Sequence, residues 1–290
     1  MLVKFSAYLD KSGVHLLKCV RFKLPLFSFP PIERPMIRLL SLIISTCCAL
    51  IFALPTYSAE IDMELPGSVA SVAAYHRSSA RLEDMLDSRS MELGAPIFIR
   101  IFKRSSELEV WLQKRGGRFE LFKTYIICRY SGELGPKLRV GDKQAPEGFY
   151  SVNAGQMNPW SKNHLSFNLG YPNDYDQTHD RSGSALMVHG GCTSIGCYAM
   201  TDYYMDEIYT LADAALARGQ AAFDVHIFPF RLTSSNLTFY LSSPWYSFWT
   251  NLQQGYDLFE KYRLPPKVEV FDKRYVFSHQ YNNSIARIGF

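Results

Sequence analysis

The amino-acid sequence predicts a mainly β protein with flanking helices, of the α+β class. Between residues 97 and 127, apolar and polar residues alternate in three short runs, separated by the turn-like segments KRSS and KRGG. This pattern indicates a meander of antiparallel strands. Further short strands with glycine-rich corners follow, which favours a β-sandwich or a barrel. Apolar residues recur at helical spacing on both sides of this β region, so helices should flank it.

Residues 1–59 are expected to be a leader. Residues 36–59 contain one Arg, then an uncharged and largely apolar stretch of 16 residues, then a proline and small residues, as a secretory signal peptide does. The stretch is shorter than the ~20 residues that span a bilayer, so we expect cleavage near Glu60 rather than a stable membrane anchor. Residues 1–35 are basic and do not suit an export signal, which points to Met36 as the true start.

The charge is concentrated in the leader. Residues 1–38 hold seven Lys and Arg against two acids, whereas from Glu60 onward 24 Lys and Arg face 25 Asp and Glu. The body of the protein is therefore close to neutral, which argues against nucleic acid as a partner. Aromatic residues make up 14% of the chain, a content that suits β structure and grooves for sugars or peptides.

The expected elements divide the remaining chain into a helical segment (60–96), a catalytic domain (97–228) and a C-terminal extension (229–290). A helix over 68–94 should close at Gly94, and a second should follow Cys197, with Asp202 as its N-cap and Gly219 as its stop. The extension should hold an aromatic helix over 244–263 and a hairpin at 267–277. Strands are expected at 97–102, 107–113, 119–127, 149–152, 164–172, 184–190 and 223–230.

The segment HGGCTSIGCYAM, residues 189–200, carries the candidate chemistry. A thiol nucleophile needs a base and donors for the oxyanion that forms on attack. His189 ends a predicted strand and can supply the base for Cys197, eight residues later. The glycines at 190, 191 and 196 allow a tight return loop between the two and a close approach of backbone N–H groups to a substrate. The plainer alternative is a buried cysteine in a turn beside a core histidine.

Three cysteines remain after the predicted cleavage: Cys128, Cys192 and Cys197. An odd number in an oxidising compartment leaves at least one free thiol. Cys192 could pair with either of the others, and the sequence does not choose between them. Cys128 lies in a predicted strand and is expected to be a small core residue. The spacing H-x2-C-x4-C lacks a clear fourth ligand for zinc, so no metal site is expected.

The same segment resembles the signature of the L,D-transpeptidase (YkuD domain) family, a His-Gly pair followed by S-x-G-C. The similarity covers roughly residues 97–228, including QAPEGFYSVN and LSFNLGYPNDYD, and is closest to the exported murein L,D-transpeptidases of Gram-negative bacteria. It implies a β-sandwich with the nucleophile on a loop beside a cleft, no cofactor, and a periplasmic location. By position, Cys197 would attack the amide after the L-centre of meso-diaminopimelate in a peptidoglycan stem and form a thioester, with His189 as base and then acid.

Other residues are assigned supporting roles by this resemblance. The backbone N–H groups of Gly196 and Cys197 are candidates for the oxyanion hole, Ser194 for orienting His189, and Gly190 for supporting the site. Tyr171 and Asn173, together with Asp176, could line the cleft or simply form a turn. His164 and His179 are interpreted as surface or loop histidines.

Two positions depart from the family pattern. Ile195 stands where many members have histidine, and Ala199 stands where many have an arginine that handles the acceptor side. We therefore expect hydrolysis beside transpeptidation, on stem peptides or on the amide that joins diaminopimelate to a wall-attached lipoprotein. A catalytically silent wall-binding module is the alternative of another class.

Overall fold

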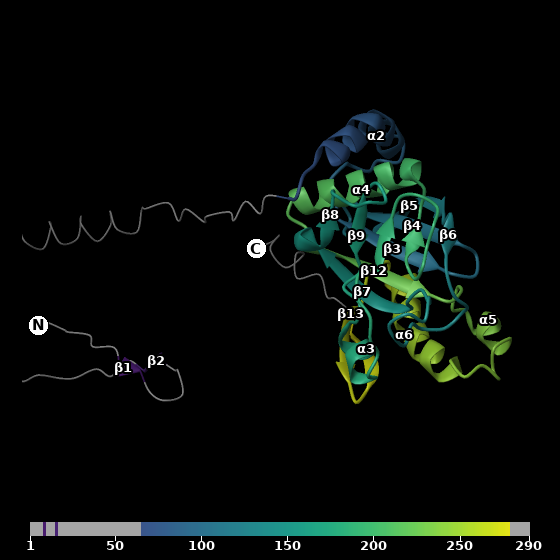
Figure 1. Cartoon of the computed structure of the whole chain (residues 1–290). Coiled ribbons are helices and arrows are strands. Elements are labelled where there is room, and N and C mark those ends of the chain that lie inside the picture. The colour runs from purple at the N-terminus through teal and green to yellow at the C-terminus, as the bar shows by residue number, and fades with distance from the viewer. Residues whose placement is uncertain (1–7, 10–14, 17–64, 279–290) are drawn as a thin grey trace, which may run out of the picture. The chain divides into compact units, whose positions relative to one another are not determined.

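The computed structural model describes residues 8–9, 15–16 and 65–278 (Figure 1). The chain divides into two compact units, Met1–Ile61 and Asp62–Phe290. In the first, β1 (Tyr8–Leu9) pairs antiparallel with β2 (His15–Leu16). The predicted signal peptide at 36–59 lies outside the described residues. Among the helices of the described ranges, none is both long and apolar enough to cross a membrane.

The second unit is built on two five-stranded sheets, and the predicted fold class is confirmed. The larger sheet has the order β5-β4-β3-β12-β7, in which β3 and β12 are parallel and the other neighbours antiparallel. The alternating runs predicted between 97 and 127 form its first three strands. The bounds are β3 (Ile97–Phe102), β4 (Glu107–Gln113), β5 (Phe119–Ile126), β7 (Gly148–Asn153) and β12 (Ala222–Phe228).

The smaller sheet has the order β6-β11-β10-β9-β8 and consists of strands of two or three residues. The strands predicted at 164–172 and 184–190 are shorter than expected, because Gly170 and Ala185 have positive φ of 74° and 54° and interrupt the extended backbone. Its members are β6 (Arg129–Tyr130), β8 (Met157–Asn158), β9 (Ser166–Asn168), β10 (Met187–His189) and β11 (Tyr198–Ala199).

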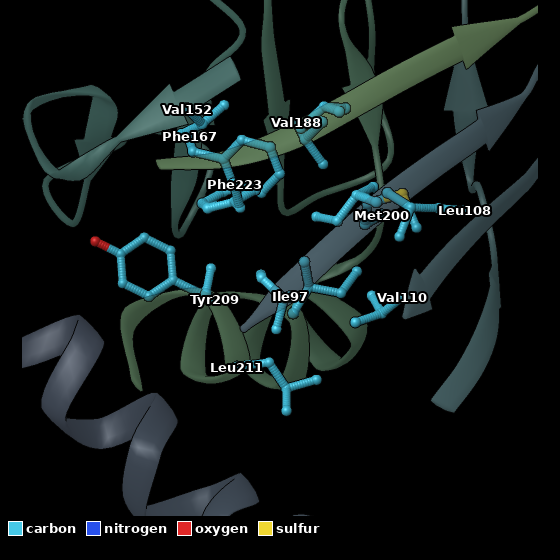
Figure 2. Packing of buried hydrophobic residues seen from close by; sticks show 14 of the residues in the cluster. Ile97, Leu108, Val110, Val152, Phe167, Val188, Met200, Tyr209, Leu211 and Phe223 are labelled. Atoms are coloured by element: carbon cyan, nitrogen blue, oxygen red, sulfur yellow. The ribbon is translucent and has the colours of Figure 1, made fainter. Parts of the chain in front are cut away.

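One apolar core joins the two sheets and two helices, α2 (Val69–Asp87) and α4 (Asp202–Ala217). Figure 2 shows Phe167 and Val188 of the small sheet near Phe223 of the large one, with Tyr209 and Leu211 from α4 on the other side. Burial of large side chains stabilises such a core by roughly 1.5–3 kcal/mol each. This core fixes the small sheet that carries the candidate site.

The helix ends differ from the prediction in two places. α2 stops at Asp87, well before Gly94, with Ser88 as its C-cap and Ser90 at a φ of 54°. α4 is capped by Thr201 rather than by Asp202, because the Thr201 hydroxyl accepts from the backbone N–H of Tyr204 at 3.4 Å. Thr201 has a φ of 68°, which is unusual for a β-branched residue.

Residues 229–278 cover the other face of the large sheet (Figure 1). α6 (Tyr246–Tyr262) and the hairpin of β13 (Lys267–Phe271) and β14 (Arg274–Ser278) occur where an aromatic helix and a hairpin were predicted. With α5 (Ser234–Thr238), they bury a second apolar cluster. The short α3 (Asp174–Thr178) and the 3-10 turn η1 (Ala154–Gln156) complete the unit. The cluster consists of Phe102, Phe149, Tyr175, Phe228, Phe230, Leu232, Leu237, Phe248, Trp249, Leu252, Tyr256 and Tyr275.

Candidate functional site

The parallel pair of β10 and β11 brings the predicted base and nucleophile together. Val188 lies opposite Tyr198, and His189 opposite Ala199. Side chains alternate along a strand, so Val188 and Tyr198 enter the core while His189 faces the other side. Cys197 immediately precedes β11, two residues before Ala199, so the same alternation puts it on the face of Ala199. It is therefore the diagonal neighbour of His189 on one face of the sheet.

Cys197 is a free, partly exposed thiol. The backbone N–H of Met187 donates to Sγ at 3.4 Å, and Sγ lies 3.8 Å from the carbonyl oxygen of Ala185. Burial raises the pKa of the Cys197 thiol above its ordinary value, while the Met187 N–H and the charge of Lys137 act in the opposite direction. The resting group is therefore a thiol at neutral pH and needs a base to become a nucleophile.

His189 is held in the tautomer that such a base requires. Its side chain is buried, and Nδ1 lies 2.5 Å from the carbonyl oxygen of Gly190. Because a carbonyl only accepts, Nδ1 must carry the hydrogen, which leaves the lone pair on Nε2. No hydrogen bond joins His189 to Cys197 in the described part of the chain. Catalytic hydrogen bonds are often loose before substrate binds.

The return loop is anchored at its start by the first turn of α4. Asp202 Oδ1 accepts from the backbone N–H of Gly191 at 2.7 Å. A Cβ added to Gly190 would lie 2.7 Å from that same oxygen and 2.8 Å from both the Asn163 carbonyl oxygen and His164 Cβ. The N–H of Gly190 donates to a protein carbonyl, that of Leu165. In this structure, Gly190 serves close packing beside His189.

The other supporting residues are engaged with protein groups. The Ser194 hydroxyl donates to the carbonyl oxygen of Cys197 at 2.7 Å, so it holds the turn before β11 and forms no hydrogen bond with His189 in the described residues. The Gly196 N–H donates to Ser131 Oγ at 2.6 Å. An oxyanion could take this N–H only by displacing Ser131. The roles of Ser194 and Gly196 in catalysis stay predictions.

A disulfide joins Cys128 and Cys192, with 5.4 Å between their Cα atoms. The prediction of Cys128 as a small core residue is wrong, because both cysteines are exposed and Cys128 lies between β5 and β6. The bond ties the return loop to the edge of the sheet and leaves Cys197 as the free thiol of the described residues. Within these residues, no group of three or more His, Cys, Asp or Glu is placed to hold a metal ion.

Tyr171 and Asn173 form hydrogen bonds with other parts of the chain. The Tyr171 hydroxyl donates to the carbonyl oxygen of Lys137 at 3.1 Å. Asn173 is the N-cap of α3, and its amide donates to the Phe149 carbonyl oxygen at 2.8 Å. Neither side chain forms a hydrogen bond with Cys197 or His189 in the described part of the chain. A role in substrate binding stays a prediction for both.

The two histidines predicted to lie on the surface or in loops, His164 and His179, have structural partners. His164 Nε2 lies 2.5 Å from Asp206 Oδ1, and His179 stacks on Tyr175.

Sequence reasoning missed three residues that hold or influence the site: Ser131, Lys137 and Asp202. Ser131 and Lys137 lie some 60 residues before Cys197 in an irregular segment, and no local pattern marks them. Asp202 was interpreted as a helix cap.

Comparison with known proteins identifies the family. No family model matches the chain. The protein named "Putative L,D-transpeptidase YafK" from Escherichia coli K12 is 44% identical over 195 residues, which cover 67% of this chain and 79% of that protein, and its counterpart in strain O157:H7 matches equally.

Solved structures with some likeness include the helical cell shape determining protein Pgp2 from Campylobacter jejuni, with 15% identity, a TM-score of 0.36, and coverage of 66% of this chain and 80% of that one. Bd1075 from Bdellovibrio bacteriovorus gives 17% identity, a TM-score of 0.33, and coverage of 63% and 84%. The identity and coverage of the Escherichia coli relatives decide the assignment: the chain belongs to the L,D-transpeptidase family.

Proposed function

We propose that the protein is a cysteine-dependent acyltransferase that acts on the amide after the L-centre of meso-diaminopimelate in peptidoglycan stems. The main support is the free thiol of Cys197, placed diagonal to His189 on one face of β10 and β11. The identity of 44% to an L,D-transpeptidase relative supports the substrate class through the family.

In the first half-reaction, Nε2 of His189 accepts the proton of the Cys197 thiol. The thiolate attacks the carbonyl carbon of the scissile amide and gives a tetrahedral oxyanion. This intermediate collapses by breaking the C–N bond, and the leaving amine takes the proton from His189. The stem remains on Cys197 as a thioester. We assign the oxyanion to the N–H groups of Cys197 and Gly196, the latter exchanging its Ser131 partner for the substrate oxygen.

The second half-reaction resolves the thioester. His189 removes a proton from the incoming nucleophile, which attacks the thioester carbonyl, and the released sulfur takes the proton back as Cys197 thiol. An amine from a neighbouring stem gives a 3→3 cross-link. Water gives a hydrolysed stem. Transpeptidation is the first choice because it is the reaction for which the family is named.

Hydrolysis is the second candidate, and Ala199 favours it. Ala199 lies opposite His189 in the register and is fully buried, so its methyl group offers no charge to hold the carboxylate of an acceptor stem. Ile195 on the return loop is exposed and adds an apolar surface. Water then competes with the weakly held amine. The amide that links diaminopimelate to a wall-attached lipoprotein is the proposed hydrolytic substrate.

Acylation of Cys197 is tested by intact-mass analysis of the purified protein after incubation with a carbapenem, because β-lactams of this class acylate the family. We expect one adduct, lost in Cys197→Ala and retained in Thr193→Ala, a change at an exposed position of the same loop. A folded wild type without an adduct would instead favour a silent wall-binding module.

The reaction outcome is tested with disaccharide tetrapeptides and protein-linked muropeptides, whose products are read by mass. Cross-linked dimers would support transpeptidation, and trimmed stems or freed protein would support hydrolysis. Dimers accompanied by neither of those products would exclude the second candidate.

We further propose a periplasmic location. The disulfide between Cys128 and Cys192 supports it, since such bonds persist in oxidising compartments. We expect the mature protein in the periplasmic fraction to begin near Glu60, as read by N-terminal sequencing. A protein that still begins at Met1 or Met36 would contradict the proposal.

A further inference from the structure

A cavity of about 640 Å³ lies where β7, β12, the start of α3 and strand β13 meet. Its volume suits a small molecule or the end of a polymer side chain. The lining does not include Cys197 or His189. Two residues connect it to the site: the N–H of Leu169 in its wall donates to the carbonyl oxygen of Leu186, whose side chain lies beside Gly196.

The charged groups of the lining are mostly acidic. Asp174, Asp224 and Glu269 face one cation, Lys267. Lys267 pairs with Glu269 at 2.6 Å, and both side chains are exposed. Within the described residues, neither Asp174 nor Asp224 forms an ion pair. The cavity therefore presents uncompensated negative charge.

Two polar side chains of β12 line the cavity, the partly buried Asp224 and the buried His226. Asp224 and His226 are two residues apart, so they share a face of the strand. Burial raises the pKa of the Asp224 carboxyl to about 6, and its compensating contact is a hydrogen bond with Ser151. His226 is 1% exposed, and its Nδ1 has no hydrogen-bond partner among the described residues.

Asp224 lacks a positive charge and His226 lacks a hydrogen-bond partner, and one kind of ligand group can supply both. Burial, together with the nearby charge of Arg100, lowers the pKa of His226, so its imidazole is neutral and can accept a hydrogen bond. Asp224 is partly buried and has no counter-charge among the described residues, and a carboxylate withdrawn from water without one is costly. A protonated amine has three N–H donors and one positive charge, and it satisfies both deficiencies at once.

We propose that this cavity is a second binding site, which takes the ammonium group at the D-centre of a diaminopimelate side chain. The ammonium donates to Asp224 and His226, with Asp174 at the entrance, and the carboxylate on the same carbon faces Lys267. The proposal rests on the proposed function for its ligand, since it assumes a peptidoglycan substrate. The ring of Tyr175 offers no free face for a sugar to stack on, because it is stacked between His179 and Tyr275.

Such a site would hold a second stem of the same polymer while Cys197 acts on the first. Two linked contacts on one polymer raise the apparent affinity without any new contact at the thiol. Loss of this site should therefore weaken action on intact wall more than action on a short muropeptide.

The binding test uses the purified full chain and isothermal calorimetry at pH 7.5. The probes are the tripeptide L-alanyl-γ-D-glutamyl-meso-diaminopimelate and the same peptide with its free side-chain amine acetylated. We expect the free amine to bind at least tenfold more tightly than the acetylated peptide, and Asp224→Asn to remove that difference. Equal affinity for both peptides, or an unchanged difference in Asp224→Asn, would overturn the proposal.

The matched control is Asp213→Asn. Asp213 on α4 is also a carboxyl whose pKa is raised by burial, but it is outside the cavity lining. This variant should keep the full preference for the free amine. Asp174→Asn is a second variant at the cavity entrance, and it should weaken binding of the free amine by a smaller factor. It keeps the proposal testable if Asp224→Asn does not fold.

The carbapenem adduct on Cys197 separates this proposal from the proposed function. Asp224→Asn should form that adduct at the wild-type rate, and its KM on isolated wall sacculi should rise while the rate on a short muropeptide stays unchanged. If the wild type forms no adduct but still discriminates between the two peptides, the second site stands without the enzymatic proposal. An equal loss of Asp224→Asn activity on both substrates would indicate a damaged fold and contradict a separate site.

Discussion

At the scale of single residues, the protonation of Cys197 decides how the site can work. Burial raises the pKa of the thiol, so near neutral pH the group keeps its proton. Nδ1 of His189 is committed to the Gly190 carbonyl oxygen, so Nε2 is the nitrogen free to take that proton. The pair therefore depends on transfer to His189 and does not begin as a preformed thiolate.

His189→Ala should reduce the rate of carbapenem acylation by about 10²–10⁴-fold at pH 7, the usual contribution of a general base. The deficit should shrink as the pH rises, because above its raised pKa the thiol ionises without help. Time-resolved intact-mass analysis from pH 7 to pH 10.5 measures the loss of rate at pH 7 and its change with pH. A deficit that stays constant over this range would show that His189 does not act as the base. His179→Ala, at a histidine with a structural partner, is the control.

Gly190 is a glycine for reasons of space. Its Cβ would meet Asp202 Oδ1 at 2.7 Å and backbone and side-chain atoms of Asn163 and His164 at 2.8 Å. Overpacking of this kind costs about 1–3 kcal/mol. We expect Gly190→Ala to lower the free energy of unfolding in urea by about that amount. Gly116→Ala is the matched control, since a Cβ there meets nothing within 4 Å. Equal effects of both changes would contradict the packing argument.

At the scale of elements, the C-terminal helix supports the segment beside the thiol. Trp249 of α6 donates its indole N–H to Glu147 Oε2 at 2.8 Å, and the Gly135 N–H donates to Oε1 at 2.7 Å. Lys103 pairs with the same carboxylate at 3.1 Å, and both side chains are fully buried. The segment so held, residues 131–147, includes Ser131, which binds the Gly196 N–H.

Trp249→Phe should therefore disturb the site from a distance. It removes one donor from the buried Glu147 carboxylate, which costs about 1–3 kcal/mol. We expect a lower melting temperature and a slower acylation of Cys197 in the protein that remains folded. Trp160→Phe serves as control, because Trp160 is 67% exposed. A destabilised Trp249→Phe with an unchanged acylation rate would mean that α6 only contributes stability.

Long elements could be predicted from the sequence, and very short ones could not. The strands between 97 and 127, and α4 and α6, are long enough for their periodicity to be read. β6, β8 and β11 have two residues each, which is too short to show a period of two. His189 and Cys197 were found because one loop holds both, whereas Ser131 comes from another part of the chain. Its contact exists only once the sheets have formed.

At the scale of the whole molecule, one covalent bond links the return loop to a distant part of the chain. Cys128 and Cys192 are 64 residues apart, and the segment between them contains β6 to β10. Closing a loop of this size in the unfolded chain stabilises the native state by about 2–5 kcal/mol. The sequence could not choose this pairing, because the choice depends on β6 lying beside β11.

The disulfide also determines how many thiols can react. In a chain that begins at Glu60, titration with an aromatic disulfide reagent after denaturation should detect one thiol, Cys197, and three after reduction. Reduction should also lower the free energy of unfolding by about 2–5 kcal/mol. Because the bond tethers the loop between His189 and Cys197, acylation by a carbapenem should slow as well, and Cys128→Ser with Cys192→Ser should reproduce both effects. Three thiols before reduction would refute the pairing. A reduced protein that is less stable but acylated at the same rate would show that the bond stabilises the fold without positioning the nucleophile.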